Sequence, residues 1–388
     1  MKICYNEKLK KLSPYLFIEI DKKKKEAIER GADIISLGVG DPDLPTPKHI
    51  IKSMQEAVTR SENHQYPFGA GLLSYRKAVA EWYKKRFNVD LSADEVCALI
   101  GSKEGIGHMH LGFINPGDVV LIPEPGYPVY NTGTIFTEGV PYFMPLLEKN
   151  DFLPDLGAIP SDILKKAKLI FINYPNNPTA AVAPKEFYLE LIEFAKKNNI
   201  IVAADAAYSE IYYDENEKPS SFLEFFGAKE IGVEFHSLSK TYNMTGWRIG
   251  WVCGNKDVVA GIAKVKDNYD SGVFQAVQEA AITALTSSQK CVEDARKMYK
   301  ERRDALVEGL QKLDWKVNLP KASFYVWAKV PEGYTSSQVV AKLLDEAAII
   351  CTPGNGMGKS GEGYVRFALT VNVPRIKEAI ARISKIKW

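Results

Sequence analysis

Short apolar runs alternate with amphipathic stretches through the middle of the chain. The apolar runs lie at 96–100, 119–122, 169–172, 200–204 and 233–235, and each ends in a polar or Gly/Pro-rich turn. Between them, apolar side chains at helical spacing predict helices over 103–113 and 184–198. Strands that alternate with helices predict an α/β fold with a mainly parallel sheet flanked by helices. In such sheets ligands bind beyond the carboxyl ends of the strands.

The pattern changes near residue 274, where a long helical stretch is predicted to run toward Lys312. The segments that follow predict, in order, a strand, a helix, a strand and a helix at 324–330, 337–347, 364–369 and 374–386. Strands separated by longer helices are typical of a smaller α+β domain. We therefore predict a large domain over 46–275 and a small domain made of 1–45 and 276–388.

Composition narrows the class of protein. The chain has 388 residues, 46% of them hydrophobic and 25% charged, and 50 basic against 48 acidic residues leave a formal charge of +2. This balance argues against a nucleic-acid or membrane partner attracted by bulk charge. Five scattered cysteines without a CxxC pair, and a polar start without a signal-peptide stretch, predict a soluble cytoplasmic protein. The five histidines show no metal-type spacing with nearby acids, so no metal is predicted, and His108 and His110 are expected to have packing roles.

The segment 237–250 places an amine, two hydroxyls and a guanidinium close together, on Lys240, Ser237, Ser239 and Arg248. An amine that condenses with a carbonyl, beside donors for a phosphate, is what a site for pyridoxal 5′-phosphate (PLP) needs. The segment resembles the Schiff-base lysine motif of the class I/II aminotransferases, which are fold type I PLP-dependent enzymes. The resemblance implies that fold, that cofactor and a ping-pong reaction through a Schiff base on Lys240.

A second segment supplies a phosphate site. Gly101 to Gly105 (GSKEG) lies between a predicted strand and a predicted helix, where backbone N–H groups and the helix dipole can bind an anion. Alone, such a turn is most often an ordinary strand-to-helix connection. Beside Lys240 it favours a phosphate site that contains Ser102 and Lys103, completed by the hydroxyl and guanidinium donors of the lysine segment.

The pyridine ring of PLP needs a carboxylate that keeps its nitrogen protonated. Asp205 ends a predicted strand, although an acid there could also cap the next helix. In the family that this segment resembles, the aspartate pairs with the pyridine nitrogen and the tyrosine three residues later reaches the 3′-oxygen. Asp205 and Tyr208 match these positions, and Tyr127 matches the aromatic residue that stacks on the ring.

The segment 173–180 resembles the family's NPxNPTG loop, in which the second asparagine contacts both the 3′-oxygen and the substrate carboxylate. Asn177 matches that asparagine. Ala180 replaces the usual glycine, and because alanine disfavours a positive φ, the path of the loop after Asn177 stays open.

An amino-acid substrate carries an α-carboxylate, which a guanidinium binds in bidentate fashion. Arg366 lies inside an apolar C-terminal run, in the context of the family's carboxylate-binding arginine. Gly40 matches the loop that closes over the substrate. Tyr66 matches the tyrosine that reaches the neighbouring subunit's phosphate, which implies an obligate homodimer with shared active sites.

The catalytic set implied by the resemblance is Lys240, Asp205 and Tyr208. Once substrate has displaced it, Lys240 becomes the general base that moves a proton from the substrate Cα.

Within the class, four segments are similar to LL-diaminopimelate aminotransferases: 12–17, the GSKEG turn, 125–130 and 270–275. That family moves an amino group from LL-2,6-diaminopimelate to 2-oxoglutarate, forming tetrahydrodipicolinate and glutamate in lysine and cell-wall precursor synthesis. The far end of such a substrate carries an ammonium and a carboxylate, so it needs a second polar pocket. Tyr15, Lys103 and the segment 268–275 are the candidates.

Other functions stay open at this point. A general aminotransferase for aspartate, alanine or aromatic amino acids is the nearest alternative, and a PLP-dependent carbon–sulfur lyase is a more distant one, because a fold does not fix the reaction. A non-enzymatic PLP-binding regulatory module is disfavoured, since only about forty residues precede the first motif. The amino donor and its stereochemistry, the physiological direction and any assembly beyond a dimer are not determined by the sequence.

Overall fold

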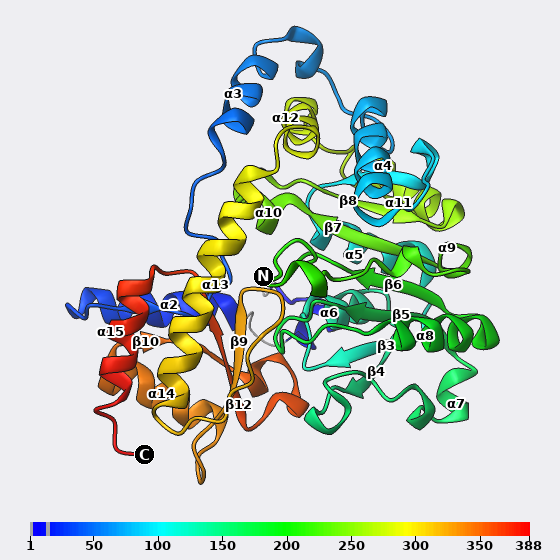
Figure 1. Cartoon of the computed structure of the whole chain (residues 1–388). Helices are drawn as coiled ribbons and strands as arrows, with labels where there is room; N and C mark the ends of the chain where they lie inside the picture. The colour runs from blue at the N-terminus through cyan, green and yellow to red at the C-terminus, as the bar shows by residue number, and fades with distance from the viewer. Residues whose placement is uncertain (1–2, 13–15) are drawn as a thin grey trace.

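The computed structural model describes residues 3–12 and 16–388. Its centre is a seven-stranded sheet in the order β2-β8-β7-β6-β5-β3-β4 (Figure 1). The strands are β2 (Val96–Leu99), β3 (Val119–Glu124), β4 (Val140–Pro145), β5 (Ala167–Asn173), β6 (Ile201–Asp205), β7 (Gly232–Ser237) and β8 (Gly250–Gly254). β8 pairs antiparallel with both β2 and β7, and the other pairs are parallel. The predicted mainly parallel sheet is confirmed, although β4 and β8 were not among the predicted strands.

Both faces of this sheet are buried, which explains why its central strands are continuous apolar runs. Side chains alternate between the faces: in β5, Leu169 and Phe171 pack into one core, and Ile170 and Ile172 pack into the other. The first core contains side chains from α5 (Ser102–Phe113), α6 (Val129–Phe136) and α11 (Lys256–Tyr269). The second contains side chains from α4 (Leu73–Phe87), α8 (Lys185–Asn198) and α12 (Gln275–Thr286).

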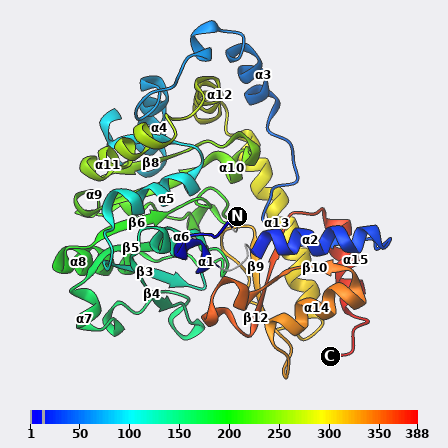
Figure 2. The ribbon, with the colours of Figure 1, turned by 180° about the vertical axis from the view of Figure 1, so that it is seen from behind.

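A smaller set of strands forms beside the large sheet (Figures 1 and 2). β9 (Tyr325–Lys329), β12 (Tyr364–Ala368) and β11 (Thr352–Pro353) make a three-stranded antiparallel sheet, and β1 (Ile35–Ser36) pairs in parallel with β10 (Ile349–Ile350). Their apolar side chains share a core with those of α13 (Lys290–Gln311), α14 (Ser336–Ala347) and α15 (Val373–Ile383). The early strand β1 is thereby packed with the C-terminal part of the chain.

The long helix predicted toward Lys312 is wrong in one respect, because the structure divides it into α12 and α13. Ser287 is extended (φ −79°, ψ −177°), and the Gln289 amide donates to the carbonyls of Ala284 and Ser287, 2.9 Å away in each case. A side chain that satisfies the last carbonyls of a helix stabilises its end. α12 then packs against α3 (Lys48–Ala57) and α4.

The remaining α-helices are short or peripheral: α1 (Glu7–Lys10), α2 (Leu16–Glu29), α7 (Ser161–Leu164), α9 (Ala228–Ile231) and α10 (Leu238–Thr241). Among the residues that the structure describes, no helix has the length and apolar character needed to cross a membrane.

Candidate active site

The carboxyl ends of β5, β6 and β7 and the start of α5 meet at a cavity of about 320 Å³. This is the edge of the sheet at which the sequence predicts a ligand. Eleven of the predicted site residues line the cavity: Gly40, Ser102, Lys103, Tyr127, Asn177, Asp205, Tyr208, Ser237, Ser239, Lys240 and Arg248. Segments far apart in the sequence are thus brought to one place.

Lys240 lies on α10, directly after β7, and its Nζ donates a hydrogen bond of 2.6 Å to the carbonyl of Gly40. Burial lowers the pKa of Lys240 to about 8, and the charges of Arg366 and Arg248 act in the same direction, whereas Asp41 opposes them. A lowered pKa keeps a larger share of the amine neutral and therefore nucleophilic.

Asp205 ends β6 as a buried carboxylate with a partner that the sequence analysis missed. The hydroxyl of Tyr130 donates to Oδ2 of Asp205 over 2.7 Å. Burial raises the pKa of Asp205 to about 6, and the hydrogen bond from Tyr130 opposes this rise because it favours the ionised form. Tyr130 lies at the start of α6 in the same short segment as Tyr127, and that nearness to a predicted site residue is the signal that could have identified it.

The turn before α5 fits closely against Arg248. Gly101 has φ +71°, and a Cβ atom at this position would lie 2.5 Å from Nη2 of Arg248. Arg248 is itself held by a 2.8 Å hydrogen bond from Nη1 to the carbonyl of Thr245. The first residues of a helix have N–H groups without helical partners, so the start of α5 beside a guanidinium can hold a phosphate.

Arg366 on β12 is fully buried and meets Asn177 from the other side of the cavity. Nη1 donates to Oδ1 of Asn177 over 2.7 Å, and Nη2 donates to the carbonyl of Gly38 over 2.7 Å and to Oγ1 of Thr352 over 3.2 Å. The guanidinium lies 4.3 Å from the ring centroid of Tyr325. The two residues predicted to bind the substrate carboxylate are therefore adjacent.

Tyr325 on β9 is a second residue that the sequence analysis missed. Its hydroxyl lies 3.0 Å from that of Tyr208, and it lines the cavity. A side chain at position 40 would collide with this hydroxyl, which explains the glycine there. Tyr325 comes from a strand far along the chain, so no local pattern connects it with Tyr208.

The loop after Asn177 takes a left-handed turn despite the replacement of the usual glycine. Ala180 has φ +61°, and its N–H donates to the carbonyl of Asn176 over 2.9 Å. The loop path after Asn177, which the sequence left open, therefore keeps a left-handed conformation at Ala180. Glycine would adopt this conformation with less strain than alanine.

Of the three other predicted residues, Arg366 is connected to the cavity by its hydrogen bond to Asn177. Tyr66 lies outside the cavity, with 74% of its surface exposed, beside the equally exposed Phe68. Tyr15, a candidate for the distal pocket, lies outside the described residues.

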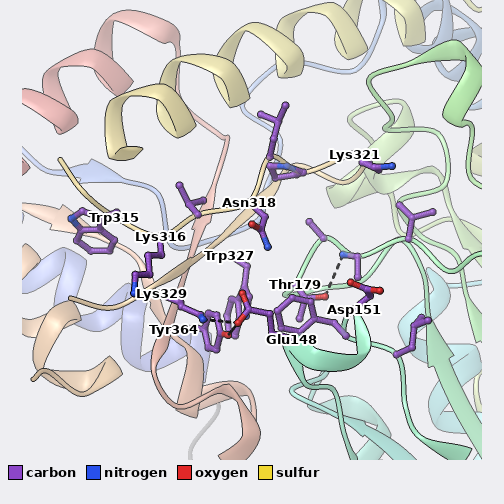
Figure 3. A pocket seen from close by; sticks show the side chains of 18 of the residues that line it. Glu148, Asp151, Thr179, Trp315, Lys316, Asn318, Lys321, Trp327, Lys329 and Tyr364 are labelled. Carbon is purple, nitrogen blue, oxygen red and sulfur yellow. Dashed lines mark hydrogen bonds and ion pairs between the residues drawn. The ribbon is translucent and has the colours of Figure 1, made fainter. Parts of the chain in front are cut away.

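A larger cavity of about 770 Å³ is lined in part by the residues that follow Asn177 in the chain, among them Thr179 (Figure 3). Thr179 and Ala180 line it, and Glu148 bridges one wall by contacts with Lys329 (2.5 Å) and the Tyr364 hydroxyl (3.5 Å). Its lining contains none of the predicted site residues. The smaller cavity is the candidate active site because it combines an amine of lowered pKa, a buried carboxylate and a phosphate-type turn.

The residues of the smaller cavity fit PLP. The dianionic phosphate fits the start of α5 beside Arg248, the pyridine nitrogen requires a carboxylate such as Asp205, and the aldehyde requires an amine such as Lys240. The close approach of Arg248 to Gly101 is the feature that argues most specifically for an anion at this turn.

Comparisons with known proteins agree with this chemistry. The family model described as "Aminotransferase class I and II" matches residues 32–383. The LL-diaminopimelate aminotransferase of Maridesulfovibrio salexigens is 58% identical over 381 residues, which cover 98% of both chains. The protein of the same name from Aquifex aeolicus is 56% identical over 384 residues, with 99% of both chains covered.

Solved structures give the same result for the fold. Substrate-bound BacF from Bacillus subtilis superposes with a TM-score of 0.95 at 38% identity and covers 99% of this chain and 98% of that one. A single mutant of Thermus thermophilus aspartate aminotransferase superposes with a TM-score of 0.92 at 27% identity and covers 99% of this chain and all of that one. The expected fold type I architecture is confirmed.

Proposed function

We infer, from the premise that this chain belongs to the class I and II aminotransferase family, that it transfers an amino group from LL-2,6-diaminopimelate to 2-oxoglutarate. As a member of that family it is a PLP-dependent aminotransferase. The observation that carries the choice of substrate is the 58% identity with an LL-diaminopimelate aminotransferase over 98% of both chains. The products would be tetrahydrodipicolinate and glutamate, in lysine and cell-wall precursor synthesis.

The roles of the cavity residues follow from their chemistry. When bound, PLP supplies an electron sink for the electrons left on the substrate Cα. Lys240 would take the proton from Cα and deliver it to the carbon of the former aldehyde group, and in the second half-reaction it would move a proton in the opposite direction; its lowered pKa permits this near neutral pH. Asp205, held by Tyr130, keeps the pyridine nitrogen protonated.

The other residues bind and orient. Ser102, Lys103, Ser237, Ser239 and Arg248 would hold the phosphate, Tyr208 and Asn177 the 3′-oxygen, and Tyr127 the face of the ring. Arg366 would bind the substrate α-carboxylate together with Asn177, because two parallel N–H donors match the two oxygens of a carboxylate. The Gly40 loop would close over the substrate.

The far end of the substrate needs donors for a second carboxylate and acceptors for a second ammonium. Lys103 lines the cavity and can face that carboxylate. Tyr15 and the segment 268–275 complete the proposed distal pocket.

The proposed homodimer with shared sites would cover an exposed aromatic surface. Tyr66, Phe68 and Tyr269 are 74–76% exposed, and Gly69 N donates to Asp267 Oδ1 over 2.9 Å, which holds the two aromatic segments together. Exposed aromatic side chains are typical of protein interfaces. In the dimer Tyr66 would reach the partner's phosphate.

Two further expectations complete the proposal. The division into a large domain over 46–275 and a small domain of 1–45 and 276–388 is supported by the separate cores, although the packing of α12 on α3 and α4 favours a border after α12. A cytoplasmic location is supported by five cysteines that are all free.

The test is a half-reaction. LL-2,6-diaminopimelate is added to the purified PLP-loaded protein without a keto acid, and the cofactor's absorption spectrum is followed. We expect the absorption band of bound PLP to be replaced by that of the aminated cofactor. With aspartate or alanine in place of LL-2,6-diaminopimelate, we expect this conversion to be far slower. Conversion by aspartate or alanine but not by LL-2,6-diaminopimelate would leave a general aminotransferase and refute the substrate assignment.

A further inference from the structure

A buried cluster of charged side chains lies next to the candidate active site. Lys266 on α11 is fully buried, and its Nζ donates to Glu104 Oε1 over 2.7 Å and to Asp270 Oδ1 over 3.1 Å. His108 Nδ1 lies 2.7 Å from the same Glu104 oxygen, and its Nε2 lies 3.5 Å from Asp270 Oδ2. Lys266, Glu104 and His108 have no role in the reaction as described above, and Asp270 enters it only as part of the segment 268–275 proposed for the distal pocket.

The spacing of residues gave no metal-type arrangement around His108, yet the fold brings it within 4.8 Å of two carboxylates. A metal is not needed to explain the cluster, because the Lys266 ammonium contacts both carboxylates and supplies the positive charge between them. A buried ion pair stabilises a structure only when each charge keeps a well-placed partner. The cluster therefore connects α5, which carries Glu104 and His108, with the C-terminal end of α11, which carries Lys266 and is followed by Asp270.

Glu104 connects the cluster to the phosphate turn. It lies in the first turn of α5, and its Oε2 accepts a 2.9 Å hydrogen bond from the N–H of Ile100. Gly101 and Ser102, which begin the proposed phosphate site, lie between these two residues. The Glu104 carboxylate thus fixes the turn through the N–H of Ile100, and the Lys266 ammonium in turn holds the Glu104 carboxylate.

Asp270 connects the cluster to the segment that carries Tyr66. Its Oδ1 also accepts the N–H of Gly272 over 2.9 Å, and a Cβ atom on Gly272 would lie 3.5 Å from the carbonyl of Pro67. Further along, the buried Gln278 accepts the N–H of Leu72 and donates to the carbonyl of Val273, at 2.7 Å each. The residues that follow Tyr66 are therefore supported by the segment that Asp270 shapes.

We propose that Lys266 is a positioning residue that couples the phosphate turn of one subunit to the segment which that subunit presents to its partner. Because one ammonium bonds both Glu104 and Asp270, a displacement of the 270–273 segment is transmitted to the first turn of α5. The two phosphate sites of the dimer are then mechanically linked, each through the partner's Tyr66 segment. The inference depends on the proposed function, in which Tyr66 contacts the partner's phosphate.

A double-mutant cycle on the full-length dimer tests the coupling. PLP affinity of the cofactor-free protein is measured by fluorescence titration for the wild type, Asp270→Asn, Tyr66→Phe and the double variant. Asp270→Asn keeps the size of the side chain and an oxygen for the Gly272 N–H, but it removes the charge that Lys266 binds. We expect Tyr66→Phe to weaken PLP binding in the wild type, and to do so by a factor at least about threefold smaller in the Asp270→Asn background.

Lys266→Met tests the cluster directly, with Lys264→Met as the matched control. Lys264 is exposed on the same helix, so its replacement should leave PLP affinity unchanged. Lys266→Met leaves two partly buried carboxylates without their ammonium, and we expect PLP affinity to fall about tenfold or more. Circular dichroism and sedimentation show whether the variant is a folded dimer, and if it is not, the Asp270→Asn cycle decides.

The outcomes separate the inference from the proposed function. If Tyr66→Phe leaves PLP affinity unchanged in the wild type, the contact across the dimer is wrong, and the inference fails with it. If Tyr66→Phe weakens binding by the same factor in both backgrounds, the dimer proposal stands and the coupling through Lys266 is refuted.

Discussion

The hydrogen bond from Tyr130 to Asp205 allows a sharp test of how the protein would control the cofactor's ring nitrogen. Tyr130→Phe removes the donor of a 2.7 Å bond while the ring keeps its stacking on Phe171, at 4.7 Å between centroids. Asp205 stays buried, and among the described residues the more distant N–H of Ala207, 3.4 Å from Oδ1, remains as a donor to its carboxylate. The substitution therefore changes the charge environment of Asp205 and little else.

The direction of the effect follows from which form the hydrogen bond favours. Tyr130 donates to the ionised carboxylate and lowers the pKa of Asp205, which burial has raised to about 6. Without the hydrogen bond from Tyr130 the pKa of Asp205 is higher. When the pH is lowered, Asp205 is therefore protonated earlier than in the wild type. A hydrogen bond to a charged group contributes about 1.5–3 kcal/mol. At about 1.4 kcal/mol per pH unit, the acid limb of PLP binding should move upward by about 1–2 pH units.

The assay is the PLP affinity of the cofactor-free protein as a function of pH, for the wild type and Tyr130→Phe. Tyr174→Phe is the matched control, because Tyr174 is also buried and donates to a backbone carbonyl, that of Phe152, over 2.9 Å. We expect the acid limb of the wild type and the control near pH 6, and that of Tyr130→Phe at higher pH. An unmoved limb in Tyr130→Phe, or one displaced to lower pH, would refute the reasoning.

Three further results are expected. The rate at which the cofactor-free protein captures PLP should rise with pH through about 8, as Lys240 loses its proton, and a rate independent of pH from 6 to 9 would contradict its lowered pKa. Arg366→Lys loses the bidentate contact, so KM for the amino donor should increase about 10- to 100-fold in steady-state assays, whereas an unchanged KM would exclude the proposed carboxylate contact. Ala180→Gly relieves a φ of +61° and should increase the free energy of unfolding, measured by urea denaturation, by up to about 1 kcal/mol. The same change at Ala181, where φ is not positive, should decrease that free energy. A decrease at both positions would show that Ala180 is not strained.

The parts of the site that the sequence could predict are those carried by contiguous motifs. Lys240, Ser237 and Ser239 share one segment, and Asp205 ends a strand whose apolar run marks it as buried. Because strand ends of a parallel sheet meet at one edge, motifs that follow such runs can be placed together without coordinates. The structure brings these residues to one cavity.

The parts that the sequence missed depend on contacts between distant segments. Tyr325 meets Tyr208 across 117 residues, and Glu104 meets Lys266 across 162, so neither pair leaves a local pattern. Lys266 is a particular case, since a lysine in an amphipathic helix is ordinarily exposed. Its complete burial follows only from the two carboxylates that the fold places around it.

The division of the long predicted helix shows a different limit. Leu285 and Val292, on either side of the polar residues 287–289, are seven residues apart, which is a helical spacing. Periodicity alone therefore predicts one helix across this region. The end of α12 is decided by side-chain hydrogen bonds of Gln289 and by the packing of α12 against α3 and α4. Tertiary contacts of this kind override a local preference.

The central claim is that Lys240 is the amine that binds PLP, and chemical trapping tests it most directly. The PLP-loaded protein is reduced with borohydride, digested and analysed by mass spectrometry, with Lys240→Ala treated in parallel. We expect the reduced cofactor on the peptide that contains Lys240, and no stoichiometric label in the variant. A label on Lys103 or another lysine in the wild type, or no label after PLP loading, would contradict the account.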